Sequence, residues 1–356
     1  MSRRAVLLLM GVIAAALGHS AAWADDNGGQ KRAIDAGQSL IGTRAPRLVL
    51  TTIDGATIDL GKLYGKQAVY LKFWATWCVP CRQQMPHFEH AYESAGTDLA
   101  VIAINTGFND SVEQIRKFKD QTHITMPIVM DDGTVAAAFH LRVTPQHIVI
   151  GRDGKILYVG HLADAALDAA LVAARNATPV NARMAAGTGA RTKPVLHAGD
   201  SLVSERVRTI DGRTLPLSDP AKQRPTVVVF LAPWCESYLA TSRPESSVKC
   251  RQMREQVEAL SSEQGVRFIG IASGLWASEQ DLRDYRKQYG VRLPLSLDAS
   301  GDRFRAFAVT QVPTAILIDS QGHLQRRVDV NELPSLAAPH TAGLSRTAAF
   351  AAGGSE

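Results

Sequence analysis

The stretch FWATWCVPCRQQMP at residues 73–86 places Cys78 and Cys81 two residues apart, directly behind Trp77. The largely apolar residues 68–74 before it predict a buried strand, and apolar residues recur at helical spacing after it. Cys78 is therefore expected at the junction between this strand and the following helix. Free backbone N–H groups and the helix dipole stabilise an anion at that position, which lowers the pKa of a thiol.

This tight cysteine pair predicts thiol–disulfide exchange. We expect Cys78 to be the exposed attacking thiol and Cys81, one turn into the helix, to be buried behind it and to resolve a mixed disulfide. Pro80 suits the first helical turn, where its missing N–H costs nothing. A structural zinc half-site lacks the second CxxC or CxxH that would complete it. A static disulfide would need neither Trp77 nor this strand-to-helix setting.

The same device returns in FLAPWCESYLATSRPESSVKCRQM at residues 230–253, where Cys235 and Cys250 are held apart by a polar insert. The tetrapeptide TIDG at 52–55 recurs at 209–212 with the offset of 157 residues that also relates Cys78 to Cys235. Beyond the insert the offset is 168 to 169 residues. A register that shifts at only one place indicates a duplicated unit with one insertion.

Both copies predict the same order of elements. A small hairpin precedes the buried strand, further strands and helices alternate, and each copy closes with a proline-initiated strand and a hairpin. The expected strands are 68–74 and 99–104 in the first copy and 226–231 and 266–272 in the second; the expected helices include 112–121 and 279–288. This alternation favours an α/β fold with a mixed central sheet flanked by helices, present twice.

The motif FWATWCVPCR, with Pro86 five residues after Cys81 and Pro145 before a closing strand, resembles the TlpA/ResA/CcmG group of exported thioredoxin-fold thiol-disulfide reductases. The resemblance covers nearly all of residues 38–175 and, more loosely, 198–330, and the expected domains are 38–176 and 198–332. It implies two tandem thioredoxin-like domains, with Cys78 as attacking and Cys81 as resolving thiol. It also implies that Pro145 is a cis-proline facing the dithiol.

Three positions depart from that group's pattern. Lys72 stands where thioredoxins carry an acid, Gln84 replaces the usual Glu, and Thr144 before the cis-proline is commoner among disulfide isomerases. Thr144 is expected to touch the disulfide. The redox direction therefore stays open between reductase, isomerase and oxidase.

Lys72 has two interpretations: a strand-edge lysine whose amine reaches water, or a cation that stabilises the thiolate. His87 and His90, near Met85, either bind copper or belong to an ordinary helix surface. We expect the surface, with no metal site and no cofactor.

The second pair is expected to form a disulfide, because Cys235 ends a strand and Cys250 starts a helix close to it. The insert carries Tyr238 at the position of the second cysteine and would cover the corner where substrates approach. Pro313 keeps the cis-proline signature. A structural disulfide that cross-links a loop beside a degenerate active site is favoured over a second redox centre.

Two further replacements support that preference. Val229 stands in place of Lys72, and Glu255 in place of Pro86. A peroxidase is disfavoured, because Ala232 occupies the position of the threonine that peroxiredoxins carry.

The chain ends and composition indicate where the protein works. Residues 1–24 combine a basic start, an apolar run and Ala-Trp-Ala, which predicts a cleavable signal peptide and a periplasmic protein with no later membrane span. The formal charge of +5 is too mild and too evenly interleaved with acids to favour nucleic-acid binding. Residues 177–197 are expected to be a linker, and 333–356 a disordered tail.

We therefore expect an exported oxidoreductase that reduces protein disulfides through Cys78 and Cys81, in cytochrome c or metal-centre maturation as the resemblance implies. Its partners would be protein thiols or disulfides and an upstream electron donor. The alternative class is a metallochaperone or scaffold that captures a cysteine-bearing partner without turnover.

Overall fold

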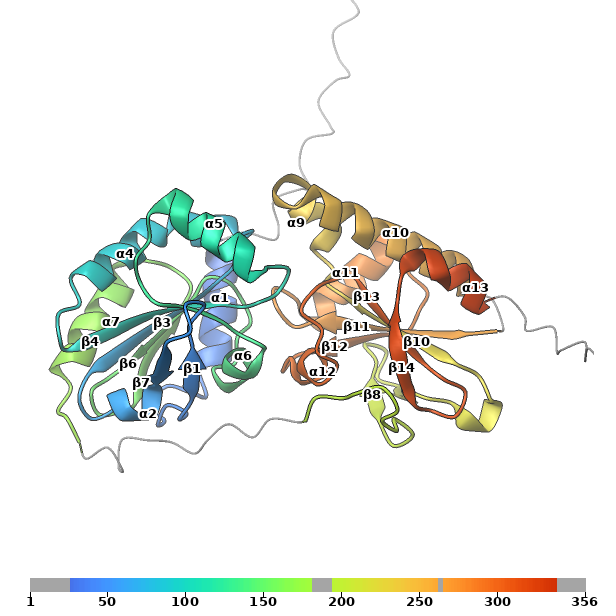
Figure 1. Ribbon diagram of the computed structural model, residues 1–356, viewed down its shortest axis with the longest axis horizontal. Coiled ribbons are helices and arrows are strands. Elements are labelled where there is room, and N and C mark those ends of the chain that lie inside the picture. The colour runs from blue at the N-terminus through green and yellow to red at the C-terminus, as the bar shows by residue number, and fades with distance from the viewer. Residues whose placement is uncertain (1–25, 181–193, 262–264, 338–356) are drawn as a thin grey trace, which may run out of the picture.

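The computed structural model describes residues 26–180, 194–261 and 265–337. It contains two α/β units side by side, each with a mixed five-stranded sheet between helices (Figure 1). The expected fold class is thereby confirmed. Within the described residues, no helix combines the length and apolarity needed to cross a bilayer.

The sheet of the first domain has the order β5-β4-β3-β6-β7. Strand β3 lies at the centre of this sheet. All seven of its residues are buried, because both faces of the strand are covered. Strands β4 and β5 run parallel to β3, whereas β6 runs antiparallel to β3 and β7 antiparallel to β6. The strands are β3 (Ala68–Trp74), β4 (Leu99–Asn105), β5 (Ile128–Met130), β6 (Gln146–Ile150) and β7 (Ile156–Gly160), with a separate hairpin of β1 (Val49–Thr51) and β2 (Thr57–Asp59).

Helices cover this sheet and place the cysteine motif at one end of β3. Helix α7 packs against β3, β6 and β7, α4 packs against β4, and α1 packs against β7. The helices are α1 (Asp26–Gly37), α2 (Leu60–Leu63), α3 (Val79–Gln83), α4 (Met85–Glu93), α5 (Val112–Thr122), α6 (Thr134–Ala138) and α7 (Ala165–Asn176). Sequence patterns did not predict α1.

The second domain repeats this arrangement with the sheet order β12-β11-β10-β13-β14. Its strands are β10 (Thr226–Leu231), β11 (Arg267–Ser273), β12 (Leu295–Asp298), β13 (Thr314–Ile318) and β14 (Leu324–Val328), preceded by the hairpin of β8 (Arg206–Arg208) and β9 (Thr214–Pro216). Its helices are η1 (Pro220–Lys222), α9 (Cys235–Ser242), α10 (Pro244–Leu260), α11 (Glu279–Tyr289), α12 (Asp302–Ala306), η2 (Val330–Glu332) and α13 (Leu333–Ala337).

Two expectations about irregular segments are corrected. The polar insert is not a loop, because it forms α9 and the first part of α10. Residues 333–337 are helical rather than disordered, and α13 packs against α10. The expected signal peptide, residues 181–193 of the expected linker and residues 338–356 lie outside the described residues.

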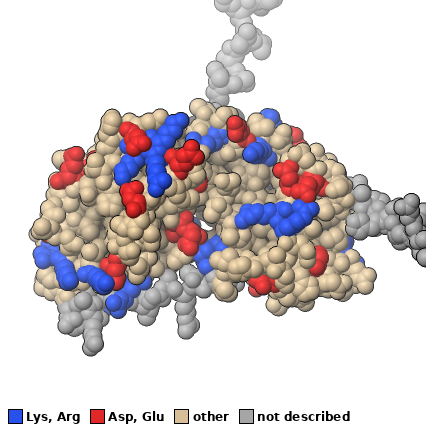
Figure 2. All heavy atoms as spheres, in the orientation of Figure 1, with Lys and Arg blue, Asp and Glu red and all other residues tan. Residues whose placement is uncertain are grey.

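The hydrophobic core continues from one domain into the other. One cluster of buried residues includes Phe73 and Trp77 of the first domain together with Trp234 and Phe304 of the second. On the outer face seen in Figure 2, acidic and basic side chains lie in small mixed groups. The two domains therefore share an apolar contact, and the ion pairs Arg243–Asp110 and Arg32–Asp281 also join them.

Candidate active site

The first cysteine motif lies at the C-terminal end of β3, in the strand-to-helix junction. Cys78 is the N-cap of α3, and the N–H of Cys81 donates a hydrogen bond to Cys78 Sγ at 3.2 Å. Pro80 occupies the first turn of α3. The two cysteines form a disulfide with Cα atoms 5.2 Å apart. In the reduced protein the same N–H would stabilise a Cys78 thiolate, because a hydrogen bond to the charged form lowers its pKa.

The loop before β6 lies against this pair because β6 is the antiparallel neighbour of β3. The Thr144–Pro145 peptide bond is cis, and Cys78 Sγ lies 3.4 Å from the carbonyl oxygen of Thr144. The equivalent Val312–Pro313 bond of the second domain is also cis. The fold therefore brings together Trp77, both cysteines, Thr144 and Pro145, as the resemblance implied.

Lys72 is not at a strand edge. It lies in the central strand between Ala103 of β4 and His147 of β6, and its side chain is fully buried. Its Nζ donates to the carbonyl oxygen of Cys81 at 3.5 Å and lies 5.3 Å from the ring centre of Phe88. Burial lowers the pKa of Lys72 to about 7. The interpretation of a lysine reaching water is therefore wrong.

A buried polar chain joins α3 to the cis-proline loop. His147 Nε2 donates to Gln84 Oε1 at 2.9 Å, Gln84 Nε2 donates to the carbonyl oxygen of His161 at 3.2 Å, and His161 Nδ1 donates to that of Pro145 at 2.7 Å. Burial, followed by the charge of Lys72, holds the pKa of His147 well below its usual range, so its ring is neutral. The departure at Gln84 thus belongs to a network that the sequence did not reveal.

The second domain covers the dithiol. Cys78 is 1% exposed and Cys81 is fully buried, so the expectation of an exposed Cys78 is wrong for this arrangement of the domains. The Trp77 and Trp234 rings stack with their centres 5.1 Å apart. Because each tryptophan precedes the first cysteine of its motif, the two motifs face each other across the domain boundary.

Side chains of the second domain reach the groups beside the dithiol. The N–H of Val79 donates to the Tyr238 hydroxyl at 3.1 Å, and Trp276 Nε1 donates to Thr144 Oγ1 at 3.3 Å. The Arg243 guanidinium donates to Thr76 Oγ1 and to the buried carboxylate of Asp110. We refer to the four contributing residues as the cover residues: Trp234, Tyr238, Arg243 and Trp276.

The second pair is also a disulfide, with Cα atoms 6.2 Å apart. Cys235 is the first residue of α9, but Cys250 lies in the middle of α10 and not at a helix start as expected. Cys235 is fully buried and Cys250 is 8% exposed. Neither cysteine therefore has the exposure that a reactive thiol requires in this arrangement.

Of the two histidines on α4, His87 is partly buried and His90 is exposed. His87 Nε2 is 3.0 Å from Asp168 Oδ1, on the side of the domain covered by α7. No group of three or more candidate metal ligands occurs within the described residues. His87 is thus held by a surface carboxylate.

Sequence patterns located both cysteine pairs, Trp234 and Tyr238, but missed His147, His161 and the other two cover residues, Arg243 and Trp276. His147 follows Pro145 by two positions on a buried strand, which was an available signal. Trp276 and Arg243 carry no comparable signal, because their partners come from the other domain.

Several known proteins are similar to part of this chain. Residues 41–159 match the AhpC/TSA family. Thioredoxin-like protein YneN of Bacillus subtilis is 37% identical over 33% of this chain and 71% of its own length; thiol-disulfide oxidoreductase ResA of Halalkalibacterium halodurans is 37% identical over 33% and 66%. A solved thiol:disulfide interchange protein of the thioredoxin family from Chlorobium tepidum is 25% identical, covers 38% of this chain and 97% of its own, and has a TM-score of 0.34. The chain therefore belongs to the thioredoxin-like AhpC/TSA family and is a thiol-disulfide oxidoreductase.

Proposed function

We propose that the chain is a periplasmic reductase of protein disulfides in which Cys78 attacks and Cys81 resolves. The observation that carries this proposal is the position of Cys78 at the N-cap of α3, with its Sγ accepting the N–H of Cys81 and lying 3.4 Å from the carbonyl oxygen of Thr144. A hydrogen-bonded N-cap sulfur is the better thiolate of the pair.

The proposed exchange has two steps. The Cys78 thiolate attacks one sulfur of a client disulfide, a mixed disulfide forms, and the other client sulfur leaves as a thiolate and takes a proton. Cys81, after losing its proton, then attacks Cys78 Sγ and releases the second client thiol. The client gains two electrons and two protons, and Cys78–Cys81 becomes a disulfide that an upstream dithiol donor must reduce.

A periplasmic location rests on residues 1–24, whose basic start, apolar run and small residues before position 25 fit a cleaved export signal. Four cysteines arranged as two disulfides suit an oxidising compartment. Cytochrome c or metal-centre maturation is proposed on the resemblance to the ResA group, with cysteine-bearing proteins as clients.

Catalysis by this site requires the two domains to separate. In thiol–disulfide exchange, the Cys78 sulfur must line up with the two sulfurs of the client disulfide. In the covered arrangement Tyr238 and Trp276 contact Val79 and Thr144 beside Cys78, which leaves no room for a client. We therefore assign the second domain the role of a movable cover rather than a second redox centre.

The test is capture of a mixed disulfide by the mature full-length chain. In Cys81→Ala, Cys78 should accumulate bound to a disulfide-containing protein such as insulin, because no resolving thiol remains. In Cys78→Ala no adduct should form through Cys81. Adducts on Cys81, or none on either cysteine, would reject the assigned roles.

Direction is tested separately by equilibrating the Cys78–Cys81 couple with glutathione. A midpoint near that of thioredoxin, about −270 mV, supports a reductase, whereas one near −120 mV, where strong oxidants lie, would reject it. Cys235→Ser/Cys250→Ser is the matched control, since it leaves only the first couple to titrate.

A further inference from the structure

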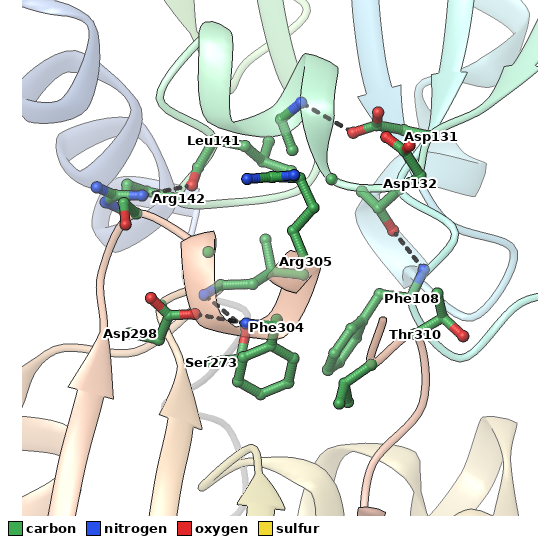
Figure 3. A pocket seen from close by; sticks show the side chains of 18 of the residues that line it. Phe108, Asp131, Asp132, Leu141, Arg142, Ser273, Asp298, Phe304, Arg305 and Thr310 are labelled. Atoms are coloured by element: carbon green, nitrogen blue, oxygen red, sulfur yellow. Dashed lines mark hydrogen bonds between the residues drawn. The ribbon is translucent and has the colours of Figure 1, made fainter. Parts of the chain in front are cut away.

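The two domains leave between them a cleft with a cavity volume of about 90 Å³, which limits a bound molecule to a small one. Helix α6 of the first domain and α12 of the second face each other across it (Figures 1 and 3). Its walls combine apolar and charged side chains from both domains. The apolar ones include Phe108, Leu141, Phe304 and Val309.

Arg305 extends from α12 into this cleft, between the two domains (Figure 3). It is 7% exposed, and its Nε and Nη2 have no hydrogen-bond partner among the described residues. Gly133 of the first domain lies directly against Arg305, since a Cβ atom at position 133 would be only 3.5 Å from Arg305 Cβ. The Arg305 side chain therefore starts at the boundary between the domains. A buried guanidinium without an anion is strongly unfavourable, which indicates a missing partner.

The carboxylates that line the cleft do not supply that partner. Within the described part of the chain, none lies within 4.0 Å of the Arg305 guanidinium. Asp131, Asp132 and Asp298 instead accept hydrogen bonds from backbone N–H groups at the starts of α6 and α12. These donors are Thr134, Val135, Ala136, Arg303 and Phe304.

A second cation comes from the opposite domain. Arg142 lines the same cleft and uses Nη1 to donate to the carbonyl oxygen of Leu141 at 2.9 Å, which leaves other N–H groups of its guanidinium for a ligand. The residues that line the cleft thus include one arginine from each domain, together with aromatic and aliphatic side chains. Such a combination fits a ligand that is charged at one end and apolar at the other.

We propose that this cleft binds a small organic carboxylate with an apolar body. The carboxylate pairs with Arg305, Arg142 is the second cation, and the body packs against Phe108, Leu141 and Phe304. Because the ligand contacts both domains, it stabilises the arrangement that covers Cys78 and slows access to the dithiol. This last consequence rests on the proposed function, whereas binding itself does not.

Binding is tested on the oxidised full-length protein, in which no turnover is needed, by thermal unfolding with benzoate and hexanoate. Either anion should raise the unfolding temperature with saturation, and neutral benzamide should have a much smaller effect. Arg305→Met should remove the response. It should also raise the unfolding temperature without ligand, because an unpaired buried charge is replaced by an apolar chain of similar length.

Arg213→Met is the matched control, because Arg213 is exposed and the variant loses the same charge. Its response to benzoate should equal that of the wild type. The proposal is wrong if neither anion acts more strongly than benzamide, or if Arg305→Met is destabilised and still responds. If Arg305 instead forms an internal ion pair, Arg305→Met should be destabilised, and neither the wild type nor the variant should respond to the ligand. That result would also reject the proposal.

The consequence for access has its own measurement, the rate at which iodoacetamide alkylates Cys78 in reduced Cys81→Ala. Saturating benzoate should slow it severalfold, and Arg305→Met should abolish the slowing. If benzoate binds but leaves the rate unchanged, the cleft is a ligand site without influence on the cover, and that part of the proposal is rejected.

Discussion

The two copies of the cysteine motif begin alike and then diverge. In both, a tryptophan–cysteine pair follows closely on the central strand of a mixed sheet, and the disulfide partners have Cα atoms 5.2 and 6.2 Å apart. In the first copy Cys81 lies one turn into α3; in the second, Cys250 lies in the middle of the longer α10, after an inserted helix. The insertion therefore kept the cross-link and changed what surrounds it.

The residue that replaced the second cysteine shows what the second copy gained. Tyr238 stands three residues after Cys235, as Cys81 stands three after Cys78, and its hydroxyl accepts the N–H of Val79 in the first domain. One copy thus contributes a sulfur at this position, and the other contributes a hydroxyl that accepts a hydrogen bond from the CxxC segment of the first domain. A duplicated active site has become part of the interface over its twin.

The largest effect expected from this division is on turnover. Cys78→Ser should reduce the reduction of insulin disulfides by dithiothreitol to the uncatalysed rate, because the serine hydroxyl is not a nucleophile at neutral pH. Cys235→Ser/Cys250→Ser should retain most of the activity. Loss of activity in the double variant together with retention in Cys78→Ser would assign turnover to the second domain.

The sequence was sufficient for the parts of the molecule that depend on local pattern. Strand β3 is buried along its whole length, so its apolar run was readable, and the offset between the copies predicted the second sheet. The position of Lys72 was misjudged because a long aliphatic chain suits both an edge and a buried site, and only the pairing with β4 and β6 decides between them.

The cover could not be predicted because its contacts join residues more than 130 positions apart. Trp276 and Thr144 are 132 residues apart, and Arg243 and Asp110 are 133 apart. A pattern within either copy contains no information on how the copies dock. The arrangement follows instead from complementary buried surfaces, such as the Trp77–Trp234 stack.

The next effect concerns Lys72, whose counterpart in the second copy is Val229. Burial lowers the pKa of Lys72 from 10.5 to about 7, so between these values the unfolded chain binds more protons than the folded chain. The free energy of unfolding of the wild type should therefore rise with pH across this window, by up to about 5 kcal/mol. Below pH 7 both states are protonated, and the full cost of burying the charge remains.

Lys72→Val, which makes the first copy resemble the second, should lack this rise. Urea unfolding of the oxidised proteins at pH 6, 8 and 10 measures the free energy of unfolding of the variant and of the wild type. The stability of the wild type relative to Lys72→Val should increase as the pH rises. Lys117→Val controls for the loss of an exposed lysine. A constant difference between Lys72→Val and the wild type at all three pH values would mean that Lys72 does not lose its proton in the folded state.

The two disulfides should differ in how much they stabilise the fold. Cys235–Cys250 closes a loop with a sequence separation of 15, and Cys78–Cys81 closes one of 3. In the chain-entropy model these contribute about 3 and about 2 kcal/mol. Urea unfolding of Cys235→Ser/Cys250→Ser and Cys78→Ser/Cys81→Ser under oxidising conditions should show the larger loss for the second pair. The reverse order would show that the inserted helices are held mainly by packing.

The smallest effect, and the most direct test of the cover, comes from one hydroxyl. Tyr238→Phe keeps the ring against Trp77 but removes the acceptor for the N–H of Val79. A neutral hydrogen bond contributes about 1 kcal/mol, so the open arrangement should become about fivefold more populated. Access to a buried thiol through such opening tracks that population when reclosing is fast. Alkylation of Cys78 in reduced Cys81→Ala should accelerate by the same factor.

Tyr289→Phe is the control, because it alters a hydroxyl on α11 within the second domain and should leave the alkylation rate of Cys78 unchanged. Equal rates in all three proteins would mean that Tyr238 does not hold the domains together, and acceleration by both substitutions would point to a general loosening of the second domain instead.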